Sequence, residues 1–435
     1  MARPAGYAFL GHGEEETRAV VKAVHWTIGS VAAAIAGLAA ALILSGLPPA
    51  AAPLEAQAAP RSAPAAPACI QPITLAAVGD VLLHDAFQRW AAEQAEGFYA
   101  AMASIRDLME AADVTIANLE GPAAANIARG FNREIASPPG RYDGNAYTGY
   151  PRFNYHPSII RDLQRLGVDV LQTANNHSLD RGGIGVDRTL DAMDAARMPN
   201  TGTRRSSVRR AAGYRWSTSF TVRRDGRDYR FAFISCTYGT NQIPDPLSQV
   251  LKCFDQRAEL LAQVRALHAD RGNAAVIVMP HWGDEYQPLP NQAQTTLAQE
   301  LADAGATAII GTHPHVVQPE AMLTARDGRR VPIVYSLGNF VSNQSGLPRL
   351  ATAIYMLGFT PARDGRLAAT MTGWIPLRMR TGAVMSVDAL DRLPEEEAAP
   401  FRAHLLQTFA AGNRLPADPS TYWNRAAAPV CAPAR

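Results

Sequence analysis

The sequence predicts a layered α/β domain, and two features of the chain lead to this prediction. Short apolar runs rich in β-branched residues recur from Ile73 onward, and segments with helical periodicity lie between most of them. The chain has 435 residues, of which 47% are hydrophobic, so it can form one large domain or two smaller ones. The net charge of +2 gives no electrostatic reason to expect binding to nucleic acid.

An uncharged apolar segment, residues 26–47, precedes the predicted domain. It is about as long as a helix that spans a bilayer. Three basic residues come before it (Arg3, Arg18 and Lys22), so the positive-inside rule places residues 1–25 in the cytoplasm. We therefore expect an uncleaved transmembrane signal anchor, with a cleaved signal peptide as the alternative.

Residues 48–68 are dominated by Ala and Pro, a composition that cannot build a core and should form a semi-extended linker. Residues 69–435 are then expected to form a domain outside the cytoplasm, in the periplasm, attached to the inner membrane by a single span. The linker would hold this domain away from the membrane surface.

The first half of the domain has elements that alternate in type along the chain. We expect strands at residues 73–78, 114–117 and 168–173, where apolar runs stop at polar segments, and helices at residues 97–112, 157–166 and 184–196. The polar stretch 123–156 is rich in Gly, Pro and Tyr, and a connection of this length in a compact domain is usually a functional loop. Its tyrosines and Arg141 would suit a substrate-facing lid, although a loop packed on the surface explains them equally well.

The second half of the domain begins with a predicted antiparallel hairpin. Residues 216–223 and 229–235 are strand-like and are joined by the turn Asp225–Gly226. Helices at residues 255–268 and 291–304 then alternate with strands at residues 275–279, 308–310 and 331–335. The remaining predicted elements are strand-like runs at residues 351–359 and 367–374 and a helix at residues 399–410.

Two histidines follow the strand at residues 308–310, which is a continuous apolar run typical of a central strand covered on both faces. Gly311 lets the backbone leave the sheet, and Pro314 stiffens the segment between His313 and His315. Neutral imidazole is a common ligand of divalent transition metals. The pattern indicates a metal site at a strand end, with two hydrogen-bonded loop histidines as the alternative.

Polar, metal-capable side chains also follow other predicted strands. Because the carboxyl ends of strands in an open α/β sheet meet in one crevice, these residues can come together although they are distant in sequence. Taken singly, each has another explanation, such as a turn residue, a helix N-cap or a hydrogen-bonded core histidine. The residues that we expect to share one site are Asp80, His84, Asn118, Glu120, Asn176, His177, His281, His313 and His315.

The mixture of imidazole, carboxylate and amide groups, without nearby thiolate, favours manganese, iron or zinc over calcium or a structural zinc site. The set is large enough for one or two divalent ions, and with two ions a bridging water could attack an ester. His177, beside the candidate ligand Asn176, would remain free to act as an acid toward a leaving group.

Four cysteines lie in the domain, and none has the C-x-x-C spacing of a zinc or thioredoxin site. Outside the cytoplasm they can pair. Cys69 and Cys431 bracket the domain, whereas Cys236 and Cys253 flank one loop, so these are the candidate disulfides. The alternative is four unpaired thiols.

Six motifs carry a resemblance to a known family: GDVLLH, NLEGP, TANNHSLDRGG, PHWGDEYQP, IIGTHPHVVQP and YSLGNF. In this order, and over about residues 73–340, they resemble the CapA family of bacterial capsule and poly-γ-glutamate synthesis proteins. That family is in turn similar to calcineurin-like metallophosphoesterases. The resemblance implies a layered β-sandwich flanked by helices, in a membrane-anchored protein that helps to make or export a surface polymer.

The resemblance also implies roles for single residues. The metal ligands would be Asp80, Glu120, Asn176, His281, His313 and His315, and His177 would be the catalytic histidine. Residues expected to contact the substrate or support the ligands are His84, Asn118, Asn175, Glu285, Tyr286 and Asn339. The sequence departs from the phosphoesterase pattern in two places: His84 lies four residues after Asp80, and the usual bridging Asp is Asn118 or Glu120.

The leading functional prediction is a CapA-like protein of surface-polymer biosynthesis or export with a metal-dependent, phosphoesterase-type site. Its partners would be the polymer or its phosphorylated precursor and a membrane-bound synthase. The alternatives are a generic exported metal-dependent phosphoesterase and a catalytically silent scaffold that binds the polymer.

Overall fold

The computed structural model describes residues 69–70, 72–130, 133–138, 140–208, 215–362, 365–420 and 430–431. The predicted cytoplasmic segment, signal anchor and linker therefore lie outside the described residues. Among the helices that the structure does describe, none is both long and apolar enough to cross a bilayer.

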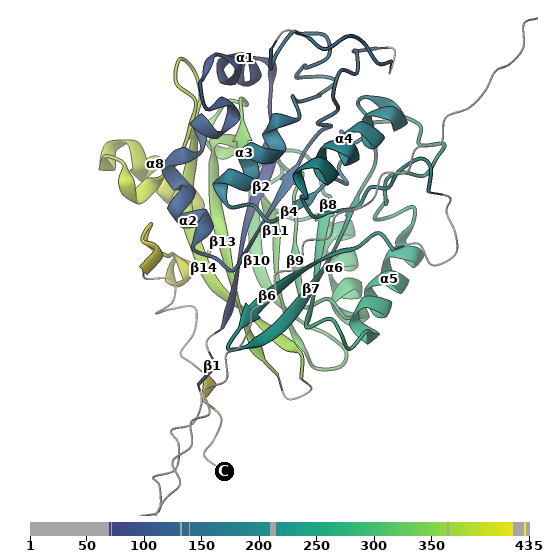
Figure 1. Cartoon of the computed structure of the whole chain (residues 1–435). Helices are drawn as coiled ribbons and strands as arrows, with labels where there is room; N and C mark the ends of the chain where they lie inside the picture. Colours follow the sequence, from purple (N-terminus) through teal and green to yellow (C-terminus); the bar gives the residue numbers. More distant parts are fainter. Residues whose placement is uncertain are drawn as a thin grey trace, which may run out of the picture. The chain divides into compact units, whose positions relative to one another are not determined.

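Two β-sheets and the helices around them confirm the predicted mixed α/β fold (Figure 1). The larger sheet has eight strands in the order β15–β14–β13–β2–β3–β4–β5, and β12 also pairs with β2. Strands β2, β3, β4 and β5 run parallel, and β12 is parallel to β2. The bounds are β2 Ile73–Leu82, β3 Val114–Leu119, β4 Val170–Gln172, β5 Asn200–Thr201, β12 Asn339–Ser342, β13 Ala351–Pro361, β14 Leu367–Arg380 and β15 Ser386–Ala389.

The smaller sheet has six strands in the order β10–β11–β9–β8–β7–β6. Its inner strands β7, β8, β9 and β11 are parallel, and the edge strands β6 and β10 are antiparallel to their neighbours. The bounds are β6 Thr218–Arg224, β7 Arg227–Thr237, β8 Ala275–His281, β9 Ala308–Ile310, β10 Val317–Thr324 and β11 Arg330–Leu337. A separate pair of two-residue strands, β1 (Cys69–Ile70) and β16 (Val430–Cys431), sets Cys69 opposite Cys431 in the backbone register.

The two sheets pack face to face. Alternate residues of each strand point to opposite sides of its sheet, so one set of side chains lies between the sheets and the other lies under the helices. Leu75 and Ala77 of β2 share a buried cluster with Ile277 of β8. Their neighbours Ala76 and Val78 point to the other face and pack under α3 and other helices. The smaller sheet is covered in the same way by α5 and α6. The result is two sheets between helical layers.

The helices differ from the prediction in several places, and the last one, expected at residues 399–410, is Glu395–Leu405. Residues 85–93 form α1, which was not expected, and residues 97–112 form two 3-10 turns (Gly97–Ala101 and Ala103–Ile105) before the short α2. Met102 and Ile105, at the joints between these pieces, have φ of −116° and −115°, which lie outside the helical range, so residues 97–112 do not form one continuous helix. The helix bounds are α1 Asp85–Glu93, α2 Arg106–Glu110, α3 Ser158–Leu166, α4 Gly182–Ala196, α5 Arg257–Ala269, α6 Gln292–Ala304, α7 Leu347–Leu350 and α8 Glu395–Leu405, with single 3-10 turns at Leu390–Arg392 and Ala411–Asn413.

Candidate metal centre

The candidate ligands gather where parallel strands of both sheets end. Asp80 and Asn118 are paired in the register of β2 and β3 in the larger sheet. His281 is the last residue of β8, and Thr312, just after β9, bridges to it in the smaller sheet. The site is thus not the crevice of one open sheet, as the sequence suggested, but the junction between the ends of two.

Asp80 is fully buried and is held from two sides. Asn118 Nδ2 donates to Asp80 Oδ1 over 2.8 Å, and the backbone N–H of His313 donates to Oδ2 over 3.2 Å. Burial alone would raise the pKa of Asp80, but its interaction with His315 and the charge of His281 lower that pKa below its usual value. Asp80 is therefore a carboxylate at neutral pH.

His281 lies between donors and acceptors from both sheets. Its Nε2 is 2.8 Å from Asn176 Oδ1 and 3.5 Å from Glu120 Oε1. Its Nδ1 is 3.0 Å from Thr312 Oγ1 and 3.2 Å from Asn118 Nδ2. Nε2 is therefore the ring nitrogen directed at the carboxylate and amide oxygens.

His313 and His315 have left-handed backbone conformations, with φ of 103° and 58°. Such conformations are unfavourable for residues with a side chain and are concentrated at functional sites. Burial lowers the pKa of His313 well below its usual value. Burial also lowers the pKa of His315, but the carboxylates of Glu120 and Asp80 outweigh it and raise that pKa to about 9.

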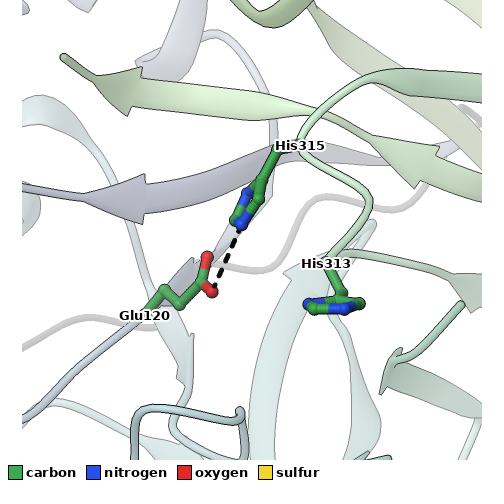
Figure 2. Close-up of side chains that lie close together, drawn as sticks. All are labelled: Glu120, His313 and His315. Carbon is green, nitrogen blue, oxygen red and sulfur yellow. Dashed lines mark ion pairs between the residues drawn. The ribbon is translucent and has the colours of Figure 1, made fainter. Parts of the chain in front are cut away.

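Glu120 follows β3 and is fully buried, yet the described residues donate no hydrogen bond to either of its carboxylate oxygens. It belongs to two groups whose ligand atoms lie within 4.8 Å of one another: Asp80, Glu120 and His281, and Glu120, His313 and His315. Figure 2 shows the second group, in which Glu120 Oε1 is 3.8 Å from His315 Nε2. A buried carboxylate without hydrogen-bond donors is costly unless cations compensate it. Protonated His315, whose pKa this carboxylate raises, can compensate it in part, and divalent ions can take that place, so this donor set fits one or two of them.

His177 lies beside these groups, with only 7% of its surface exposed. Its Nδ1 is 2.7 Å from Asp180 Oδ2, and its ring makes an edge contact with Phe153 at 4.7 Å between centroids. Burial lowers the pKa of His177, but the hydrogen bond to Asp180 outweighs it, so the net shift is upward. Because Nδ1–H donates a hydrogen bond to Asp180, Nε2 is the nitrogen left to exchange a proton with a substrate.

A cavity of about 590 Å³ opens next to the candidate ligands. Of the residues predicted to contact substrate, His84, Glu285 and Tyr286 line it; burial lowers the pKa of His84 to about 4. Asn118, Asn175 and Asn339 do not line it and instead hold other site groups. The full lining is Leu82, His84, Tyr150, Pro151, Arg152, Phe153, Asn176, His177, Asn241, Glu285, Tyr286, His315 and Gln344.

The supporting asparagines act through hydrogen bonds. Asn175 Nδ2 donates to Asn118 Oδ1 over 3.2 Å and to the Leu119 carbonyl over 2.7 Å. Asn339 Nδ2 donates to the backbone carbonyl of His315 over 3.3 Å. Both side chains therefore fix the segments that carry candidate ligands.

Sequence reasoning missed several cavity residues. From the stretch 123–156 it singled out the tyrosines and Arg141. Tyr150 does line the cavity, whereas Arg141 Nη1 donates to the Gln94 carbonyl, and the cavity-lining Arg152 was missed. It also missed Asn241. The only available signals were the length and composition of the two loops, since neither Arg152 nor Asn241 lies in one of the six motifs.

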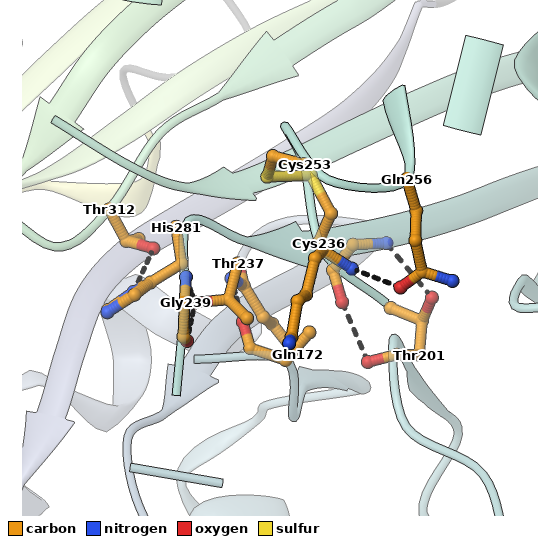
Figure 3. The surroundings of a disulfide bond; sticks show 12 residues. Gln172, Thr201, Cys236, Thr237, Gly239, Cys253, Gln256, His281 and Thr312 are labelled. Atoms are coloured by element: carbon orange, nitrogen blue, oxygen red, sulfur yellow. Dashed lines mark hydrogen bonds between the residues drawn. A yellow bond between two sulfur atoms is a disulfide. The ribbon is translucent and has the colours of Figure 1, made fainter. Parts of the chain in front are cut away.

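Cys236 and Cys253 form a disulfide at the base of the loop that carries Asn241 (Figure 3). Thr237, the first residue of that loop, lies beside His281 in the paired strands β7 and β8. The side chains of Cys69 and Cys431 are outside the described part of the chain, so their pairing stays a prediction.

Comparison with known proteins gives matches over the same region. Residues 74–344 match the family described as bacterial capsule synthesis protein PGA_cap. The chain is 32% identical over 236 residues to the capsule biosynthesis protein CapA of Bacillus anthracis, covering 54% of this chain and 53% of that protein. It is 28% identical over 235 residues to the PGA biosynthesis protein CapA of Bacillus subtilis (strain 168), covering 53% of this chain and 57% of that protein. The chain thus spans about half the length of these curated relatives.

One of the similar solved structures is a putative 5'-nucleotidase from Staphylococcus aureus in complex with alpha-ketoglutarate. The identity is 12%, the match covers 77% of this chain and 58% of that chain, and the TM-score is 0.39. A TM-score this low supports no conclusion about fold or function.

Proposed function

The chain belongs to the bacterial capsule synthesis protein family PGA_cap, and from this premise we propose that it is a metal-dependent phosphoesterase of surface-polymer biosynthesis or export. In this proposal the fold is a metallophosphoesterase-like sandwich, and residues 26–47 anchor it to the inner membrane with the site on the periplasmic side. The substrate is the polymer or its phosphorylated precursor, and a membrane-bound synthase is the partner.

Glu120 is the observation that carries the proposal. Its buried, donor-free carboxylate is shared by two groups of candidate ligands, which is the arrangement that two adjacent divalent ions require. When bound, such ions supply Lewis acidity and a water of lowered pKa. Manganese, iron and zinc all suit the nitrogen and oxygen donors.

The chain's own residues account for the remaining steps. Arg152, at the cavity wall, would bind an anionic group of the substrate. His177, held by Asp180 through Nδ1, would pass its Nε2 proton to the leaving oxygen. Phe153 and Tyr150 line this end of the cavity, and the Phe153 ring packs against His177.

The test is metal content and hydrolysis of bis-(p-nitrophenyl) phosphate by the full chain and by Glu120→Gln. We expect the wild type to bind divalent metal and hydrolyse the ester, and Glu120→Gln to lose both, because the amide keeps the shape but removes the charge. Glu320→Gln, the same change away from the site, serves as the control. Wild-type protein that binds no metal would refute the proposal.

Asn118 favours a second candidate function, a polymer-binding scaffold without catalysis. Its Nδ2 donates to Asp80 Oδ1 and approaches His281 Nδ1, so the network is partly satisfied within the protein. In that case the wild type would bind the polymer but leave phosphate esters intact, even when fully loaded with metal.

A further inference from the structure

The loop of residues 237–252, which we call the disulfide loop, contributes Asn241 to the cavity lining and is anchored at its base. The disulfide between Cys236 and Cys253 joins its ends, and both cysteines are fully buried. The backbone N–H of Tyr238 donates to the carbonyl of the candidate ligand His281 over 2.8 Å. The loop is therefore fixed to the same strand end that carries the site.

Asn241 is the residue of this loop that reaches the site. Its Oδ1 accepts a hydrogen bond from Asn176 Nδ2 over 3.2 Å, and its Nδ2 lies 3.4 Å from His177 Nδ1. Its φ of 49° is left-handed, a conformation that asparagine tolerates better than most residues. Asn241 thus contacts one candidate ligand and the candidate acid at once.

The contact with Asn176 has a chemical consequence, because the two ends of an amide are not equivalent. Only the oxygen of Asn176 can bind a metal ion, and the nitrogen can only donate. Asn241 Oδ1 accepts from the nitrogen, which leaves Asn176 Oδ1 facing His281 Nε2 at 2.8 Å. Without an acceptor at position 241, the amide loses one of the two contacts that distinguish its two orientations, and it keeps only the contact with His281.

We infer that Asn241 is a positioning residue that orients the Asn176 amide so that its oxygen faces the metal centre. This inference rests on the proposed metal site. Groups that hold a metal ligand from outside its coordination shell affect metal affinity by about 10-fold to 100-fold when they are removed.

The test measures Mn²⁺ affinity by chelator competition, and melting temperature, for the full chain and three variants. Asn241→Gly removes the acceptor while keeping the left-handed backbone free of strain. Gln242→Gly is the matched control, because Gln242 also has a left-handed φ, 61°, and is not among the described residues that line the cavity. Asn241→Asp keeps an acceptor oxygen and should restore affinity.

We expect Asn241→Gly to weaken Mn²⁺ binding about 10-fold to 100-fold. Gln242→Gly should stay near the wild type, and Asn241→Asp should bind as tightly or more tightly because of its added charge. Unchanged affinity in Asn241→Gly, or equal losses in both glycine variants, would overturn the inference and leave the metal site standing. A wild type that binds no Mn²⁺ would instead refute the proposed function, and the inference with it.

Discussion

Glu120 and the histidines around it differ in what each can do, and single substitutions can separate these roles. Glu120 is shared between two groups of ligand atoms, whereas His315 belongs to one of them. His177 makes no contact of that kind and is held by Asp180. At the scale of the residue, metal binding and proton transfer are therefore assigned to different side chains.

Replacing His315 or His177 by Ala should give opposite results for metal content. His315→Ala removes a candidate ligand, so metal per chain should fall and activity with it. His177→Ala should keep the metal and lose rate by about 10²-fold to 10⁴-fold, as expected for a general acid. Metal analysis and phosphodiester hydrolysis check both; metal loss in His177→Ala would make that residue a ligand.

Arg152 should set affinity for an anionic substrate and leave the metal untouched. It is the only arginine among the cavity-lining residues of the described chain. Arg152→Ala should raise KM for a phosphodiester by about 10-fold, in line with the loss of one charge-assisted hydrogen bond, with kcat and metal content nearly unchanged. The KM of Arg152→Lys should lie between those of the wild type and Arg152→Ala. An equal KM in Arg152→Ala would remove its proposed role.

Two elements beside the site, the disulfide loop and the start of β4, are each held by a specific contact. The disulfide loop is closed by a covalent link, and the strand β4 is entered through Asp169, whose Oδ2 accepts the backbone N–H of Thr115 over 2.8 Å. Both features hold the segments that carry candidate site residues, Asn241 in the first case and Asn176 in the second. Each has a measurable contribution to the free energy of unfolding.

The disulfide should stabilise the fold by constraining the unfolded chain. Its cysteines are 17 residues apart, and closure of a loop of that length contributes about 3 kcal/mol. The double variant Cys236→Ala/Cys253→Ala should therefore melt a few degrees lower than the wild type. Calorimetry under non-reducing conditions checks this, and an unchanged melting temperature would contradict it.

Asp169 should make stability depend on pH. Burial raises its pKa to about 6, against the hydrogen bond from Thr115, which lowers it. The folded state therefore holds the Asp169 proton more tightly than the unfolded state. The contribution of Asp169 to the free energy of unfolding is thus present at low pH and is lost as pH rises through about 6.

Asp169→Asn removes the buried charge and keeps an acceptor for Thr115. It should raise stability at pH 7.5 by on the order of 1 kcal/mol, a value reduced for partial exposure, with little gain at pH 4. Melting curves at both pH values, with the exposed hairpin variant Asp225→Asn as the control, provide the measurement. An equal effect at both pH values would show that the charge is not the cause.

The whole molecule combines two sheets, and the candidate site exists only where their ends meet. Asp80 and Glu120 come from the larger sheet, while His281, His313 and His315 come from the smaller one. Loosening of the contact between the sheets would therefore separate the carboxylates from the imidazoles. Metal binding should in turn stabilise the packing of the sheets, because it links both.

The topology of the whole chain is open to a direct test. If residues 26–47 span the membrane with the basic residues inside, a reporter fused after Arg435 should be active only outside the cytoplasm. Paired reporters that work on opposite sides of the membrane, such as alkaline phosphatase and green fluorescent protein, give the measurement. Activity confined to the cytoplasmic reporter would refute the predicted orientation.

The mixed α/β class and the family could both be predicted from the sequence, because they depend on local patterns. Strands such as β8 and β11 are visible as apolar β-branched runs, since burial on both faces selects such residues whatever they pack against. Asp80, Glu120 and the three histidines stood out as candidates because each follows a strand. Less regular elements, such as α1 and β12, were not visible, because tertiary contacts outweigh their weak local preferences.

Which strand ends meet could not be predicted from the sequence. Glu120 and His315 are far apart in sequence, and their approach depends on how two sheets stack, which no local pattern encodes. The same holds for Arg152 and Asn241, which lie in loops without periodicity and reach the cavity only because Phe153 packs against His177 and a disulfide holds the second loop. Helix and strand preferences depend on neighbouring residues in the sequence, whereas a site between two sheets depends on contacts between residues that are distant in the sequence.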